Sequence, residues 1–219
     1  MNADVYHIDS RGLQLYFPEG DGLHFVIGNV GGTGNTGFEL ATKFLPLPRL
    51  ALSAGLAYTD PKLTNGTFDA SNAGYCLQIP SCAPLVVQLA PGFKGVNVHG
   101  FQLPETSKLT VNLAADYSHP ITSAIDGFAH VDFRYQDKQY TAVTLFNSSY
   151  QAATTHLNIR LGAVRGRFTA DLFVMNATND QTPLNVVRNT EFTSFSGNFE
   201  FVGSLPPPRI YGAEILFHY

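Results

Sequence analysis

The sequence has no tryptophan, few charged residues and no long hydrophobic run. Charged residues make up 14% of the 219 positions, and 13 Lys and Arg against 17 Asp and Glu give a formal net charge of −4. This balance, without any basic stripe, argues against nucleic acid as a partner. A transmembrane helix needs about 20 consecutive apolar residues. No window of the sequence approaches that length, so a helical membrane protein is excluded.

The sequence also lacks a leader pattern and has only two cysteines. Its start, MNADVYHIDSRG, has no basic segment followed by an apolar one, so no signal peptide is predicted in the sequence as given. Cys76 and Cys82 lie in the loop GYCLQIPSCAP. They could close a small disulfide ring in an oxidising compartment or stay free thiols in a reducing one. One cysteine pair supplies too few ligands for zinc, and the histidines are scattered singly, so we predict no metal and no cofactor.

A glycine-rich stretch matches the spacing of a dinucleotide-binding loop. Gly32, Gly34 and Gly37 give G-x-G-x-x-G, and Asp60 stands about twenty residues further on, where a ribose-binding acid is expected. However, the chain reaches Pro46 too soon after Gly37 to form the crossover helix that this site requires. We therefore reject the nucleotide site.

Acidic residues recur in the middle of predicted strands. Asp116, Asp132 and Asp171 could suggest a glycosidase-like pair of carboxylates. They lie on different strands at similar depth, which fits a water-filled lumen better than a reaction centre. We predict no catalytic residue and expect that the protein is not an enzyme.

The dominant pattern is a strict alternation of apolar and polar residues over about ten positions. From Leu50 to Tyr58, Leu, Ala and Tyr alternate with Ala, Ser and Gly, and the segment from Leu109 to Tyr117 repeats the pattern. Further alternating segments cover residues 129–136, 157–161, 168–174 and 210–219. In the first of these, His130, Asp132 and Arg134 share one face, which no apolar core would accept. The sequence predicts an all-β protein of about eight long antiparallel strands.

The connections between these segments alternate in length. Leu45–Arg49, Ser118–Asp126 and Val164–Gly166 are short, whereas residues 61–106 and 180–208 form long loops. This layout is typical of transmembrane β-barrels, which have short periplasmic turns and long extracellular loops. The alternative is a free-standing eight-stranded barrel, either a small outer-membrane protein or a soluble lipid-binding barrel with its apolar residues inward.

Three stretches carry a family resemblance. They are Gly28-Asn29 with Gly37-Phe38-Glu39-Leu40, the Gly-Arg-Phe strand that ends at Asn176-Ala-Thr-Asn179-Asp180, and the terminus Pro-Arg-Ile-Tyr-Gly. In their order, the segments resemble the C-terminal part of the β-barrel of TonB-dependent outer-membrane receptors. The resemblance implies the last eight strands of a 22-stranded barrel. Residues 1–219 would then be the C-terminal portion of such a barrel, a fragment without signal peptide or plug domain.

The resemblance also implies a function, a location and partners. The parent receptor would lie in the bacterial outer membrane, in contact with its lipid, and would import a ferric siderophore, vitamin B12 or an oligosaccharide. The TonB complex would power it through the plug region that this chain lacks. Loops 61–106 and 180–208 are the expected ligand-contacting regions, although no single ligand residue can be assigned. The terminal pattern resembles the signal that the barrel-assembly machinery recognises, formed here by Tyr211, Gly212, Ile215, Phe217 and Tyr219.

Overall fold

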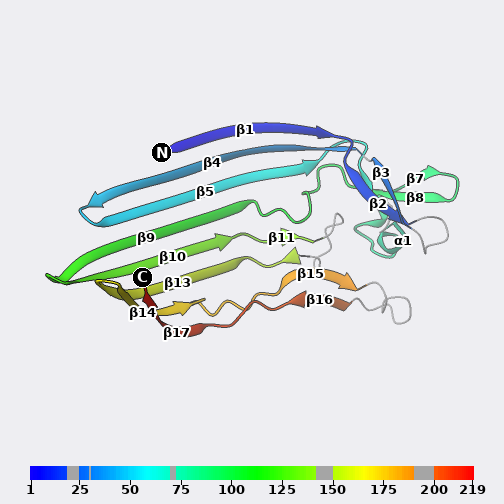
Figure 1. Cartoon of the computed structure of the whole chain (residues 1–219). Coiled ribbons are helices and arrows are strands. Elements are labelled where there is room, and N and C mark those ends of the chain that lie inside the picture. Colours follow the sequence, from blue (N-terminus) through cyan, green and yellow to red (C-terminus); the bar gives the residue numbers. More distant parts are fainter. Residues whose placement is uncertain (19–24, 30, 70–72, 142–149, 190–199) are drawn as a thin grey trace.

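Eight long strands form one antiparallel sheet in the computed structural model, which describes residues 1–18, 25–29, 31–69, 73–141, 150–189 and 200–219. Their order across the sheet is β1-β4-β5-β9-β10-β13-β14-β17 (Figure 1). They are β1 (Asn2–Arg11), β4 (Gly32–Leu47), β5 (Leu50–Leu63), β9 (Leu109–Thr122), β10 (Ile125–Gln136), β13 (Thr154–Arg165), β14 (Phe168–Met175) and β17 (Ile210–Phe217). The predicted all-β antiparallel fold is confirmed.

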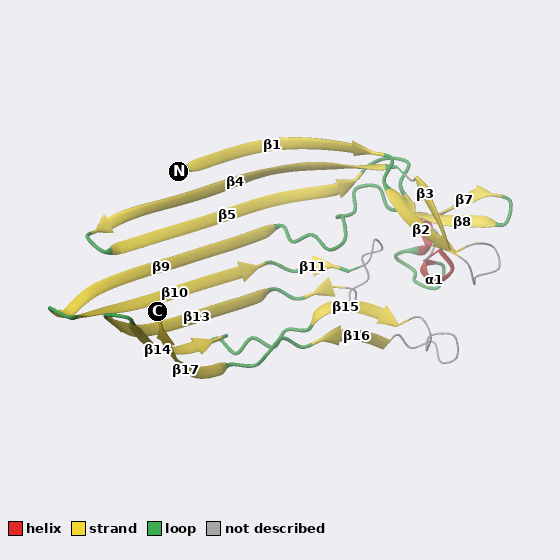
Figure 2. Cartoon of the chain, viewed as in Figure 1, coloured by secondary structure: helices red, strands yellow, loops and turns green. Residues whose placement is uncertain are grey.

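Smaller elements extend from one end of the sheet (Figure 2). They are the pairs β2 (Gln14–Pro18) with β3 (Phe25–Asn29), β11 (Gln139–Tyr140) with β12 (Tyr150–Gln151), and β15 (Leu184–Asn189) with β16 (Glu200–Ser204); the three-stranded sheet of β6 (Phe68–Asp69), β8 (Phe93–Asn97) and β7 (Val86–Ala90); and the short helices α1 (Ala73–Cys76) and η1 (Ala83–Leu85). None of the helices in the described residues is long and apolar enough to cross a membrane.

The two ends of the sheet differ in how they connect the strands. At one end, here called the short-turn end, turns at residues 48–49, 123–124 and 166–167 join neighbouring strands. Arg49 and Gly166 adopt positive φ angles of 68° and 56°, as tight hairpin turns between twisted strands require. The opposite end, here called the loop end, carries the smaller elements of Figure 1. The predicted asymmetry of short and long connections is therefore confirmed.

Alternation along each strand, combined with the register between strands, gives the sheet one apolar and one polar face. Leu56 of β5, for example, pairs with Leu40 of β4 and Val111 of β9. The apolar face is exposed rather than packed against a second layer, since Leu172 and Ile215 are 67% and 77% accessible. This face is therefore not the inside of a soluble core.

The buried hydrophobic residues of the described chain lie instead at the loop end. They are Leu63, Ala73, Cys76, Cys82, Val96 and Val98. Partly buried side chains such as Leu85 and Phe101 pack around them. The segment between β5 and β9 thus has a small core of its own.

The main sheet is open. A closed eight-stranded barrel would need β17 to pair with β1, and within the described ranges each of these edge strands pairs with one strand only. The alternative of a free-standing eight-stranded barrel does not describe this structure, because the sheet encloses no interior. The glycines of the rejected nucleotide motif, Gly32, Gly34 and Gly37, lie in β4, which is paired on both sides with antiparallel strands.

Candidate functional site

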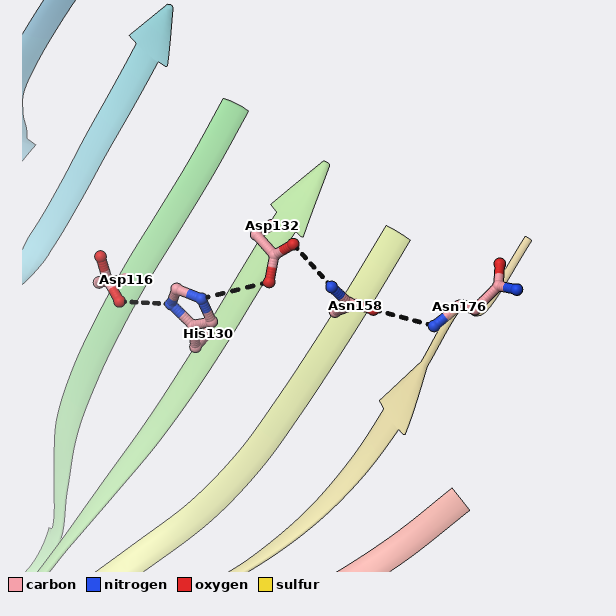
Figure 3. Close-up of polar contacts among 5 residues, drawn as sticks. All are labelled: Asp116, His130, Asp132, Asn158 and Asn176. Carbon is pink, nitrogen blue, oxygen red and sulfur yellow. Dashed lines mark hydrogen bonds and ion pairs between the residues drawn. The ribbon is translucent and has the colours of Figure 1, made fainter. Parts of the chain in front are cut away.

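A chain of polar contacts crosses the polar face of the central strands (Figure 3). Asp116 of β9 contacts His130 of β10, with 2.6 Å between Oδ1 and Nδ1. The other ring nitrogen, Nε2, lies 3.5 Å from Oδ1 of Asp132. Asn158 of β13 donates from Nδ2 to Oδ2 of Asp132 at 2.9 Å and accepts from the backbone N–H of Asn176 at 2.9 Å.

This arrangement follows from the strand register. Asp116 faces His130, and Asp132 faces Asn158, as direct cross-strand partners. Side chains opposite one another in an antiparallel pair lie close enough to interact. His130 can donate to both carboxylates only when both of its ring nitrogens carry protons. These contacts link β9, β10 and β13 to Asn176, the residue that follows β14.

A second cluster joins three strands around Arg160. Its Nη1 donates to Oδ2 of Asp171 at 2.7 Å and to Oε2 of Glu214 at 2.8 Å. The guanidinium also lies over the ring of Phe173, 5.1 Å from the centroid. The side chain of Asp171 is only 1% exposed, and its Oδ1 has no hydrogen-bond partner in the part of the chain that the structure describes. Arg160 therefore neutralises a buried carboxylate.

Three aromatic rings on this face lie directly over glycines of the neighbouring strand. The pairs are Tyr6 with Gly37, Phe128 with Gly162 and Phe173 with Gly212. A Cβ atom at Gly212 would come within 2.1 Å of the Phe173 ring, so any other residue at this position would require the ring to move. Because the rings lie against the backbone, they cover the sheet instead of projecting from it.

The end of β14 is fixed by side chains that bind backbone groups. Asn176 has a positive φ of 49° and donates from Nδ2 to the carbonyl oxygens of Asp180 and Pro207, at 2.9 and 3.0 Å. Asp180 accepts from the backbone N–H groups of Thr155 at 2.5 Å and Thr182 at 2.9 Å. Partial burial would raise the pKa of Asp180, but these hydrogen bonds outweigh burial and lower its pKa below the usual range.

Loop 61–106 contains the two cysteines. The structure joins Cys76 and Cys82 in a disulfide, with 5.1 Å between their Cα atoms. Both side chains are buried in the small core of the loop. The second predicted ligand-contacting loop, 180–208, is described only in part, because residues 190–199 lie outside the described residues.

The predicted assembly signal occupies β17 and the end of the chain. Tyr211, Ile215 and Phe217 lie on the apolar face, where they pair with Val174, Ala170 and Phe168 of β14. The rings of Phe217 and Phe168 are 5.0 Å apart. Gly212 lies on the opposite face beneath Phe173, and Tyr219 is fully exposed after the strand. Recognition by assembly machinery stays a prediction.

The alternation placed His130 and Asp132 on one polar face and Asp116 and Asp171 in the middle of strands, but it did not identify their partners. Arg160 and Glu214 are 54 positions apart in the sequence. No local pattern pairs them, because the pairing depends on the order and register of β13, β14 and β17. The alternation of Phe173 and Gly212 with apolar residues was the only signal for the aromatic–glycine pair.

Comparison with known proteins agrees with this architecture. A family model described as TonB dependent receptor-like, beta-barrel, matches residues 1–179. A search of curated proteins finds no match. Among solved structures, the ferric yersiniabactin uptake receptor FyuA of Yersinia pestis superposes with a TM-score of 0.70 at 14% identity, over 98% of this chain and 27% of that receptor.

Two receptors of Acinetobacter baumannii have the same fold. The ferric preacinetobactin receptor BauA has a TM-score of 0.61 at 15% identity, over 97% of this chain and 26% of BauA. The siderophore receptor PiuA has a TM-score of 0.61 at 16% identity, over 98% of this chain and 25% of PiuA. The chain thus spans about a quarter of the length of these receptors. Since the family model matches most of its length, this chain belongs to the TonB-dependent receptor β-barrel family, whose members are outer-membrane proteins of Gram-negative bacteria.

Proposed function

We propose that this chain forms the C-terminal part of the β-barrel of a non-enzymatic outer-membrane receptor that takes up a ferric siderophore. The observation that carries the proposal is the two-faced sheet, with an exposed apolar side and a polar side crossed by ion pairs. FyuA and BauA are named as receptors for ferric yersiniabactin and ferric preacinetobactin, and PiuA is named as a siderophore receptor. These names favour a ferric siderophore over vitamin B12 or an oligosaccharide.

The apolar face supports a position in lipid. From Leu50 to Tyr58, strand β5 keeps this face apolar over nine residues, which matches the 9–11 residues of a tilted membrane-spanning strand. Removing one exposed leucine from water contributes about 1.5–3 kcal/mol. Exposed side chains on this face include Leu161, Leu172 and Ile215. In lipid these side chains are favourable, whereas in water they would promote aggregation.

The polar face supports a position toward a water-filled lumen. Ion pairs such as Arg160 with Asp171 would be costly in contact with hydrocarbon. In this orientation the short turns face the periplasm, and loops 61–106 and 180–208 face the outside, where the siderophore arrives. Coupling to the TonB complex would require a plug region outside this chain.

The membrane orientation can be tested with two neighbouring residues. Leu52 and Ser53 of β5 point to opposite faces, as their partners Ala115 and Ala114 on β9 do. We expect a nitroxide label at Leu52→Cys, in the receptor purified from outer membranes and placed in lipid bilayers, to be reached by oxygen. The matched label at Ser53→Cys should instead be reached by a water-soluble nickel complex. Equal access of the nickel complex to both labels would contradict the proposed orientation.

The substrate class can be tested in the source organism. Deleting the gene should abolish uptake of one radiolabelled ferric siderophore under iron limitation and leave cobalamin and oligosaccharide uptake unchanged. Loss of cobalamin or oligosaccharide uptake instead would contradict the siderophore class but not the receptor role. Unchanged uptake of all three classes would contradict both.

A further inference from the structure

The apolar face becomes polar at the loop end of β1, β4 and β5. The last apolar row there contains Val5, Phe38 and Tyr58, which are aligned across the three strands. The rings of Phe38 and Tyr58 are stacked, with centroids 5.7 Å apart. The next row on the same face contains His7, Thr36 and Asp60, again aligned. An aromatic row followed by a polar one is typical of the boundary between hydrocarbon and headgroups.

Asp60 holds two lysines together at this boundary. Its Oδ2 lies 2.9 Å from Nζ of Lys62, and its Oδ1 lies 2.5 Å from Nζ of Lys108. The two lysine side chains are 55% and 37% exposed, whereas the Asp60 side chain is 22% exposed. Lys62, Lys108 and Asp60, the two lysines being called the lysine pair here, together carry two positive charges and one negative charge.

Both lysine side chains stay partly exposed among their neighbours. Lys62 is aligned with Gly34 of β4, which has no side chain, and on its other side with Gln102. The nearest acid on β1, Asp9, has its Oδ1 over Gly34, 3.4 Å from the position that a Cβ atom would take there, and this oxygen also lies 3.3 Å from Nε2 of His7. In the described chain, Asp60 is the acid paired with both Lys62 and Lys108. The pair therefore has N–H donors that Asp60 does not occupy.

We propose that Lys62 and Lys108 bind the phosphate of a lipid headgroup whose acyl chains lie against the apolar face below. This inference depends on the membrane orientation of the proposed function. Each ammonium group has three N–H donors, and the contact with Asp60 occupies one of them. The remaining donors can reach different oxygens of one phosphate. Phe38, Tyr58 and Leu109 provide the apolar surface directly below, so charge and hydrophobic contact act on the same molecule.

Each lysine near an anionic lipid surface contributes about fivefold in affinity. The test uses the receptor purified from outer membranes in a neutral detergent and titrated with dihexanoyl phosphatidic acid, dihexanoyl phosphatidylcholine or inorganic phosphate. Bound lipid is counted by native mass spectrometry. We expect phosphatidic acid to bind at least tenfold more tightly than the other two. The double variant Lys62→Gln, Lys108→Gln should lose about 25-fold in affinity for it, as two fivefold contributions require.

Two further variants make the outcome specific. The control Lys43→Gln, Lys94→Gln removes the same charge from the polar face and from β8, and it should bind phosphatidic acid like the unmodified receptor. The variant Lys62→Arg, Lys108→Arg keeps the charge beside Asp60 and should retain binding.

Unchanged affinity in the glutamine double variant, or an equal loss in the control, would overturn the inference. Inorganic phosphate binding as tightly as phosphatidic acid would indicate a free-phosphate site and would also overturn it. A water-exposed label at Leu52→Cys would instead contradict the proposed function itself.

Discussion

Removing the Arg160 guanidinium should destabilise the end of the sheet formed by β13, β14 and β17. In Arg160→Met, the carboxylate of Asp171 loses its cation while its side chain remains 1% exposed. Breaking a fully buried ion pair costs about 3–5 kcal/mol. Because the side chains of Arg160 and Glu214 are 37% and 40% exposed, solvent screens part of this loss and the lower end applies. We expect a loss of about 3 kcal/mol, which includes the cation–π contact with Phe173.

Hydrogen exchange measures this loss directly. In the purified receptor, a loss of about 3 kcal/mol should accelerate the opening of the β14 and β17 amides by roughly 100-fold. The matched control is Arg134→Met on the same face, since in the described chain its guanidinium makes one side-chain hydrogen bond, from Nη2 to Oε1 of Gln136 at 3.4 Å. It should change stability by less than about 0.5 kcal/mol. Adding Asp171→Asn to Arg160→Met should restore more than half of the loss. Equal effects of Arg160→Met and Arg134→Met would refute the role assigned to the buried carboxylate.

Four further changes have defined outcomes. Gly212→Ala should destabilise β17 by about 1–3 kcal/mol in denaturant unfolding, because its Cβ overlaps the Phe173 ring. Cys76→Ala removes the disulfide and should destabilise the folded loop by about 2 kcal/mol, because the unfolded loop is no longer closed into a ring. The loss should appear as faster proteolysis within residues 61–106. The lowered pKa of Asp180 means that its hydrogen bonds stabilise the end of β14 above its ordinary pKa of 3.8, and this stabilisation is lost as pH falls through the lower folded-state pKa. The protection of the Thr155 amide against hydrogen exchange should therefore decrease when the pH is lowered below about 4. Phe217→Ser, which removes the ring packed against Phe168, should lower the amount of receptor recovered in outer membranes.

Each of these changes has a control. Gly55→Ala places a Cβ at an ordinary 3.9 Å from Asn112 and should be nearly neutral, and equal effects at Gly55 and Gly212 would contradict the steric argument. Reduction of the disulfide should accelerate proteolysis of the loop in the unmodified receptor but not in the Cys76→Ala variant. Asp180→Asn should remove the pH dependence at Thr155, and an unchanged profile would exclude Asp180 as its cause. Leu216→Ser changes the opposite face of β17. If as little receptor is recovered in outer membranes as for Phe217→Ser, an assembly signal that depends on the apolar face would be contradicted.

The sequence alone determined the class of fold, because period-two alternation has a direct physical meaning. Successive side chains of a strand point to opposite faces, so the run from Leu50 to Tyr58 fixes an apolar and a polar side without any tertiary information. The short and long connections likewise predicted which strands form hairpins and where the loops gather. The family resemblance rests on stretches that the structure places in β3, β4, β14 and β17.

Only the tertiary structure decided which residues on those faces meet. Arg160 reaches Glu214, and Asp60 reaches Lys108, because particular strands are neighbours in a particular register. Alternation fixes the face of a side chain, but hydrogen-bond ladders between strands fix its partner. The tertiary structure also decided that the sheet is open, since alternation is the same in an open sheet and in a closed barrel. Closure depends on whether the two edge strands can pair, and that is a property of the curvature of the whole sheet.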